Sequence, residues 1–136
     1  MSIECHLAGE QRLSVSGSVR LFQITDTHLM AAPGGRLLNV DTDASLAAVI
    51  ALARQAEQAD ALLITGDIAG DGSGAAYERL DAALAPLNAP SFWLPGNHDE
   101  REDNAAVLCE RFLRRVRFPH WDVLMLNSQL PGAVEG

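Results

Sequence analysis

The sequence predicts an α/β domain, in the order β-α-β-α-β-α-β, in which helices flank a mostly parallel sheet. Three observations lead to this fold class. Short apolar segments rich in β-formers alternate with longer segments of helical periodicity, turn-forming residues separate them, and polar side chains follow directly after three of the apolar segments. The chain has 136 residues, 48% of them hydrophobic, which is enough for one domain with a core.

The first strand is expected within Val19–Thr25, and a loop through Pro33–Gly35 follows it. The segment Ala44–Glu57 is predicted to be a helix, because its apolar residues recur at helical spacing. The apolar face comprises Leu46, Val49, Ile50 and Ala53. The candidate N-caps are Asp41, Thr42 and Asp43.

The second strand is predicted at Ala61–Thr65, a continuous apolar run. Gly70–Gly74 has the composition of a turn and precedes a second helix at Ala75–Leu84. Pro86 is expected to end that helix, because proline cannot donate the backbone hydrogen bond that would continue it.

A third strand at Ser91–Leu94, a third helix at Asp103–Arg114 and a fourth strand at Val123–Leu126 complete the predicted order. Strands joined by crossover helices pair in parallel, and continuous apolar strands suit a sheet that is covered on both faces. In such sheets, ligands bind beyond the carboxyl ends of the strands. Residues that follow different strands should therefore meet in space.

Three polar motifs lie at these strand ends: Thr25-Asp26-Thr27-His28, Gly66-Asp67 and Gly96-Asn97-His98-Asp99. Each alone has an ordinary interpretation, as a capped loop or a turn. Their recurrence at equivalent positions after three strands favours a metal site instead. We interpret them as part of a two-metal site that hydrolyses phosphate esters.

The residue types suit this chemistry. Two divalent ions roughly 3.5–4 Å apart activate a water and neutralise phosphoryl oxygens, and such a pair needs a bridging carboxylate. Asp67 is the best candidate, because Gly66 allows a sharp turn before it. Asp26 and His28 are two residues apart, so an extended backbone would point both to one side and let them bind one ion. Asn97 offers a neutral oxygen, and His98 is then free to donate a proton.

Composition limits the partners and the location. The formal net charge of −8 argues against a general nucleic-acid surface and against binding to anionic membranes. Cys5 and Cys109 have no metal or redox spacing and give no disulfide framework, and no segment is long and apolar enough to span a membrane. A cytoplasmic protein is the expectation.

The order Asp-X-His, Gly-Asp, Gly-Asn-His-Asp resembles the calcineurin-like metallophosphoesterases. Ile24–Leu29 and Gly66–Gly72 look most like their bacterial class III cyclic nucleotide phosphodiesterases. The resemblance covers residues from about Val19 to Ser128 and implies the first half of a metallophosphoesterase β-sandwich. Residues 1–18 would form an N-terminal extension, and residues 19–136 a partial domain.

The resemblance implies that Asp26 and His28 bind the first metal, Asp67 bridges and Asn97 binds the second, while His98 assists the leaving group. It also implies that His28, Asp67, Asn97 and His98 contact the substrate. The substrate would be a small phosphodiester, most simply cyclic AMP. The cofactors would be two ions of Mn, Fe, Zn or Co, among which the donor set does not choose.

The second half of the resembled family supplies a further His, a Gly-His-X-His motif and a second sheet, and we expect these to be missing here. The remaining histidines, His6 and His120, are expected to be surface or packing residues. Three interpretations stay open. The favoured one is half of a longer enzyme; the others are a site completed by a partner or a second copy across an uncovered sheet face, and a non-catalytic metal-binding or interaction module. Another phosphodiesterase or nuclease of the same superfamily is also an alternative.

Overall fold

The computed structural model describes residues 9–99, 113–130 and 132–134. Its central element is a parallel sheet of β2 (Leu21–Ile24), β5 (Ala61–Thr65) and β6 (Ser91–Leu94), in the order β2-β5-β6. The bounds predicted for the second and third strands are confirmed, and the first strand is shorter than its predicted segment. This sheet carries the three motifs at its carboxyl edge.

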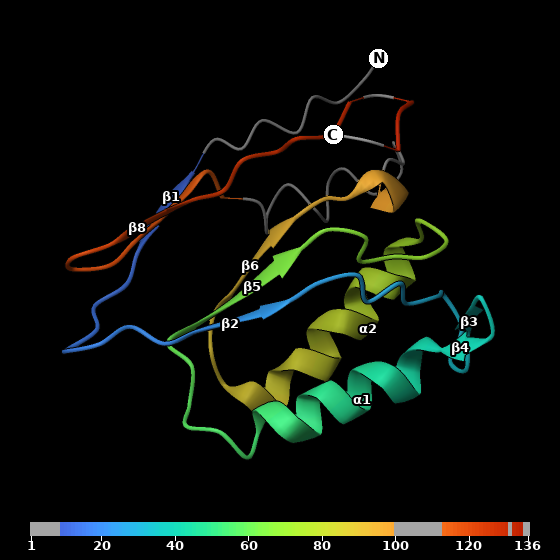
Figure 1. The fold of residues 1–136 in the computed structure, drawn as a ribbon, viewed down its shortest axis with the longest axis horizontal. Helices are drawn as coiled ribbons and strands as arrows, with labels where there is room; N and C mark the ends of the chain where they lie inside the picture. Colours follow the sequence, from blue (N-terminus) through green and yellow to red (C-terminus); the bar gives the residue numbers. More distant parts are fainter. Residues whose placement is uncertain (1–8, 100–112, 131, 135–136) are drawn as a thin grey trace.

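Two helices pack on one face of this sheet (Figure 1). Helix α1 (Thr42–Ala53) is capped by Asp41, whose side chain accepts a hydrogen bond from the backbone N–H of Ala44, as its position predicted. Helix α2 (Gly74–Leu84) is capped by Ser73 in the same way. It gives way to the 3₁₀ turn η1 (Ala85–Leu87), which contains Pro86.

A second sheet packs on the opposite face, so the expectation that this sheet would be missing is wrong (Figure 1). It consists of β1 (Glu10–Arg12), β7 (Arg115–Arg117) and β8 (Asp122–Leu124), in the order β1-β7-β8. The predicted fourth strand corresponds to β8, which lies in this sheet and pairs antiparallel with β7. The first strand, β1, lies within the segment expected to be an N-terminal extension.

Alternate residues of the central strands face the two layers. In β5, Leu62 and Ile64 pack toward the helices, whereas Ala61 packs toward the second sheet. In β6, Trp93 faces the helices and Phe92 faces the second sheet. All five side chains are buried. The central strands are therefore held between two apolar layers, which explains their continuous apolar sequence.

The segment expected to be a loop contains a short β-hairpin of two antiparallel two-residue strands, β3 (Arg36–Leu37) and β4 (Val40–Asp41). The predicted helix Asp103–Arg114 lies outside the described residues except for its last two positions. None of the helices in the described part of the chain combines the length and the apolar character that a bilayer crossing requires.

The buried position of Leu62 leads to the first prediction. Leu62→Ala should lower the free energy of unfolding by about 3 kcal/mol, because it removes a fully buried side chain and leaves a cavity in the helix-facing core. Leu52→Ala is the matched control, because Leu52 is exposed on α1, and it should change stability by less than about 0.5 kcal/mol. Urea denaturation measures both. Equal effects would contradict the assignment of the core.

Candidate metal centre

The three motifs meet at the carboxyl edge of the central sheet, because their strands run in parallel and end level with one another. Backbone hydrogen bonds continue between the loops beyond the strands. The N–H of Asp26 donates to the carbonyl of Gly66 at 3.1 Å, and the N–H of His28 donates to the carbonyl of Asp67 at 3.0 Å. The N–H of Gly66 donates to the carbonyl of Leu94 at 2.9 Å. The motif backbones are therefore fixed relative to one another.

Three of the predicted ligands have a left-handed backbone. The φ angles are 55° at Asp26, 44° at His28 and 44° at Asp67. Such conformations cost about 1–3 kcal/mol each in residues other than glycine and concentrate at functional sites. The expected reason for the proximity of Asp26 and His28, an extended backbone, is therefore wrong. Their side chains still meet, with His28 Nε2 3.8 Å from Asp26 Oδ1, because two left-handed residues turn the chain back toward the site.

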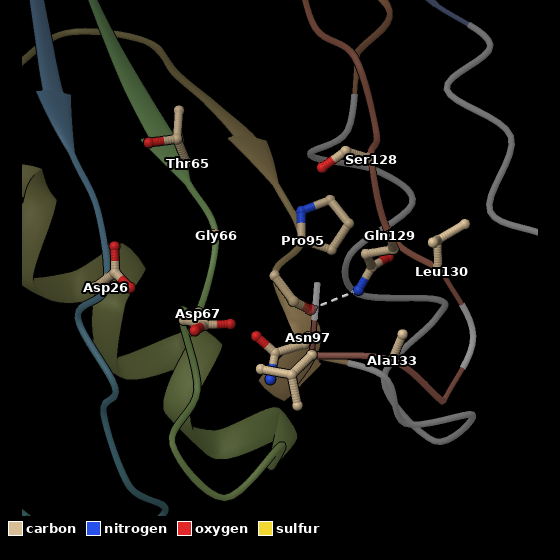
Figure 2. A pocket seen from close by; sticks show the side chains of 12 residues that line it. Asp26, Thr65, Gly66, Asp67, Pro95, Asn97, Ser128, Gln129, Leu130 and Ala133 are labelled. Carbon is tan, nitrogen blue, oxygen red and sulfur yellow. Dashed lines mark hydrogen bonds between the residues drawn. The ribbon is translucent and has the colours of Figure 1, made fainter. Parts of the chain in front are cut away.

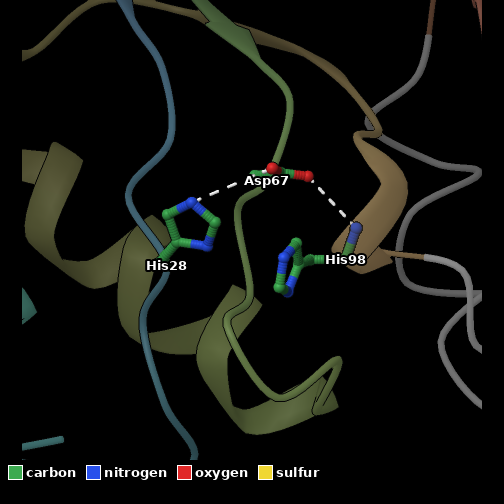
Figure 3. Close-up of side chains that lie close together, drawn as sticks. All are labelled: His28, Asp67 and His98. Carbon is green, nitrogen blue, oxygen red and sulfur yellow. Dashed lines mark hydrogen bonds and ion pairs between the residues drawn. The ribbon is translucent and has the colours of Figure 1, made fainter. Parts of the chain in front are cut away.

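Asp67 lies at the centre of the site. One of its carboxylate oxygens, Oδ2, is 3.8 Å from His28 Nε2, and the other, Oδ1, accepts a hydrogen bond of 3.1 Å from the backbone N–H of His98 (Figure 3). Its side chain is 17% exposed, against 60% for that of Asp26. Asp67 is thus held by the protein framework, whereas Asp26 faces solvent.

The rings of His28 and His98 lie edge to face, with their centroids 4.9 Å apart. Ligand atoms of His28, Asp67 and His98 all lie within 4.8 Å of one another, which is close enough for one cation to contact them. A ring nitrogen of His98, Nδ1, is 3.4 Å from the carbonyl oxygen of Gly70. His98 was predicted as a proton donor and not as a metal ligand, and this geometry places its ring beside two of the predicted ligands.

Imidazole and carboxylate donors in this arrangement fit a first-row divalent ion. His28 Nε2 faces the carboxylates of both Asp26 and Asp67, while His28 Nδ1 is buried and has no hydrogen-bond partner among the described residues. The ring is therefore oriented by its approach to the carboxylates. A cation between these groups would relieve the repulsion between the two negative charges.

Asn97 projects beside Asp67 from the 3₁₀ turn η2 (Asn97–Asp99), as Figure 2 shows. Both side chains line a cavity of about 230 Å³, which Asp26 also borders. Gln129 closes one side of this cavity, where its side-chain amide donates to the carbonyl of Gly96. The cavity thus brings together three of the predicted ligands from three different loops.

Two glycines allow this close approach. Gly66 has a φ of 93°, which confirms the sharp turn expected before Asp67. At Gly96, an added Cβ would lie 2.1 Å from Asp67 Oδ1 and 2.3 Å from the backbone nitrogen of Asp67. The Asp67 carboxylate can therefore occupy its position only because residue 96 has no side chain.

Asp99 is a positioning residue to which the sequence analysis assigned no role. It is only 3% exposed, and its carboxylate accepts four hydrogen bonds. The donors are the N–H groups of Ile68 (3.1 Å), Ala69 (3.0 Å) and Gly96 (2.7 Å) and the hydroxyl of Tyr77 (2.8 Å). Burial, together with the negative charge of Asp99, raises the pKa of Tyr77 well above its ordinary value. The available signal was a carboxylate directly after Asn97 and His98 in the same motif.

The calcineurin-like phosphoesterase family matches residues 19–130. The chain is 42% identical over 126 residues to the 3',5'-cyclic adenosine monophosphate phosphodiesterase CpdA of Pseudomonas aeruginosa, an alignment that covers 90% of this chain and 46% of the relative.

Two further relatives are similar to this chain to a comparable extent. The CpdA enzyme of Escherichia coli K12 is 39% identical over 135 residues, covering 96% of this chain and 47% of that protein. The 3',5'-cyclic-nucleotide phosphodiesterase alr5338 of Nostoc is 35% identical over 127 residues, covering 87% of this chain and 46% of that protein. The chain spans about half the length of the curated relatives that it matches.

The Asp99 network leads to the second prediction. Asp99→Asn should lower the free energy of unfolding by about 3 kcal/mol. Both carboxylate oxygens of Asp99 accept hydrogen bonds, and in asparagine an NH₂ group that cannot accept them would replace one of these oxygens. Tyr77→Phe removes one of the four bonds and should cost about 1 kcal/mol. Urea denaturation measures both, with the exposed Glu57→Gln as a control near zero. An Asp99→Asn effect no larger than that of Tyr77→Phe would contradict the network.

Proposed function

The chain belongs to the calcineurin-like phosphoesterase family, and from this premise we propose that its site hydrolyses phosphodiesters with two divalent metal ions. The observation that carries the proposal is the meeting of Asp26, His28, Asp67 and Asn97 at one sheet edge. Two ions bound there would lower the pKa of a water molecule and neutralise phosphoryl oxygens.

The positions of the four predicted ligands suggest which ion each would bind. Asp26 and His28 would hold the first ion, and Asp67 would be shared between the two ions, because it is the carboxylate that borders both His28 and the cavity containing Asn97. Asn97 would bind the second ion through a neutral oxygen, which would limit the negative charge that an anionic substrate meets. The identity of the ions among Mn, Fe, Zn and Co is set by availability.

His98 acts on the leaving group. A hydrogen bond from Nδ1 of His98 to the Gly70 carbonyl would leave Nε2 as the ring nitrogen that passes a proton to the departing oxygen. The backbone of His98 is held by its hydrogen bond to Asp67, so the ring keeps its distance from the bridging carboxylate. Asp67 would thus position both the proton donor, through the backbone of His98, and the metal ions.

The substrate that we propose is a small phosphodiester, and a 3',5'-cyclic nucleotide such as cyclic AMP is the best-supported choice. The support is the similarity to relatives that are cyclic nucleotide phosphodiesterases, together with a net charge of −8, which disfavours long nucleic acids. The turn between β7 and β8, which contains His120, lies at the far end of the molecule from the site (Figure 1). We therefore propose that further ligands come from a longer chain or from a second copy.

The third prediction concerns turnover. With added Mn²⁺, the chain should hydrolyse bis(p-nitrophenyl) phosphate and cyclic AMP, a chelator should stop both reactions, and Asp67→Asn should abolish them by removing the bridging charge. Asp60→Asn is a matched control, because Asp60 directly precedes β5, whereas Asp67 follows it. This variant should retain turnover within about twofold.

The concentration dependence of turnover separates the sources of the missing ligands. Specific activity that rises with protein concentration indicates a site completed by a second copy. A folded, metal-bound chain with no chelator-sensitive turnover at any concentration would contradict catalysis by this chain alone. That result is expected if the further ligands belong to a longer chain, or if the chain is a metal-binding module.

The fourth prediction concerns metal binding without turnover. Mn²⁺ at one hundred times its Kd should raise the free energy of unfolding by about 2.7 kcal/mol, because it binds the folded site and not the unfolded chain. Asp67→Asn should lose this stabilisation, and Asp60→Asn should keep it. Thermal denaturation with and without Mn²⁺ measures the effect, and an equal shift in the Asp67 variant would remove Asp67 from the ligand set.

A further inference from the structure

A second cavity, of about 260 Å³, lies on the other side of Asp26 and His28 from Asn97. Its walls are the loop of the first motif, the β3–β4 hairpin and the first turns of α1. Most of the surface that it presents is apolar, and Asp26 and His28 border one end. Its apolar lining comprises Ile24, Leu37, Leu38, Val40, Leu46 and Val49.

Leu38 is the most unusual residue of this cavity. It is 90% exposed, and its φ is 48°, followed by a φ of 70° at Asn39. These angles are those of a two-residue hairpin turn in which Asn, Asp or Gly is preferred at both positions. A branched apolar residue here costs free energy twice, through backbone strain and through exposure to water. Unfavourable local choices of this kind mark functional positions.

Neighbouring side chains extend the apolar surface. Val40 is 56% exposed and Val49 is 44% exposed, and both line the same cavity as Leu38. The three residues come from the turn, from β4 and from α1. Their exposed surface therefore faces one space next to Asp26 and His28.

The wall is held in place by hydrogen bonds to the loop that precedes the hairpin. Arg79 of α2 donates to the carbonyl of Met30 at 2.6 Å and also pairs with Asp43. Asp43 in turn accepts a hydrogen bond of 2.6 Å from the N–H of Gly34. The N–H of Ala31 donates to Asp71 at 2.8 Å. The loop is thus tied to both helices and to the loop after β5, and a ligand would meet a preorganised surface.

One hydroxyl of this cavity is left for a ligand. Thr25, Thr27 and Thr42 donate their side-chain hydroxyls to the backbone or to a neighbouring carboxylate. Ser45, exposed on α1, has no hydrogen bond from its side chain within the described part of the structure. An apolar surface with one free hydroxyl suits a planar ring with polar edges.

We propose that this cavity binds the nucleobase of a nucleotide phosphodiester, with Leu38 and Val40 packing against the ring. The inference rests on the proposed function, because it places the phosphodiester group at Asp26 and His28. With cations held at Asp26 and His28, as the proposed function requires, a ligand with an anionic group at one end and a planar, weakly polar body would match the order of surfaces. The anionic group would lie at the metal site, and the body against the apolar wall and the Ser45 hydroxyl. Leu38 is then a specificity-determining residue.

The test uses Leu38→Asn, which keeps a residue that tolerates the turn while removing the apolar side chain. It should raise the free energy of unfolding, because Asn suits the left-handed position better than Leu. It should also weaken binding of adenosine about fivefold, because apolar contact is lost. Adenosine carries no phosphate and is titrated without metal, with the methyl NMR signals of Val40 and Val49 as the readout.

Two control variants isolate the apolar wall. Asn39→Gly changes the other turn position and should leave adenosine binding unchanged. Leu52→Asn removes an exposed leucine elsewhere on α1 and should also leave it unchanged. Among active samples, Leu38→Asn should raise KM for cyclic AMP about fivefold and leave kcat unchanged. It should leave hydrolysis of a dialkyl phosphodiester, which has no planar ring, within twofold.

The outcomes separate this proposal from the proposed function. If adenosine shifts no methyl signal of Val40 or Val49, or binds Leu38→Asn as tightly as the original chain, the base site is overturned even where diesters are hydrolysed. If adenosine binds as expected but no diester is hydrolysed, the proposed function fails and the base site stands. If Leu38→Asn changes only the oligomeric state in sedimentation, a second copy covers the wall and the base site is overturned.

Discussion

The site depends on the buried carboxylate of Asp99. Parallel pairing brings the ends of β2, β5 and β6 to one edge, but it does not fix loops that lie several residues beyond the strands. Asp99 does so by accepting hydrogen bonds from the loop after β5, from the loop after β6 and from Tyr77 on α2. A buried charge is stable only when it is fully hydrogen-bonded, so these segments keep one arrangement.

This fixed framework explains how the predicted ligand residues can adopt unfavourable conformations. Asp26, His28 and Asp67 all have positive φ angles, and the carboxylate of Asp67 occupies space that a side chain at residue 96 would fill. The positive φ angles cost free energy locally, and the apolar layers on both sides of β5 and β6 offset that cost. The strain therefore lies where three side chains converge, while the stabilisation comes from residues that take no part in the chemistry.

The sequence predicts best the elements whose burial is uniform. The bounds of β5 and β6 are predictable because both faces of these strands are apolar, and α1 and α2 are predictable from Asp41, helical periodicity and Pro86. The second sheet was missed because all of β1 is exposed, and because Arg115 and Arg117 flank the one buried residue of β7. The strand β1 is also far away in the sequence from its partner β7. The role of Asp99 was missed because backbone donors are not visible in the side-chain pattern.

The different solvent exposures of Asp26 and Asp67 indicate from which side a ligand can enter the site. Asp67 is enclosed by the loops that Asp99 ties together, whereas Asp26 stands open between two cavities, of about 230 and 260 Å³. One cavity leads toward Asn97 and the other toward Leu38. A ligand anchored at Asp26 can therefore extend toward Asn97 in one direction and over an apolar wall in the other. The rigid side of the site favours a fixed position for the reacting group, and the open side leaves room for the rest of the substrate.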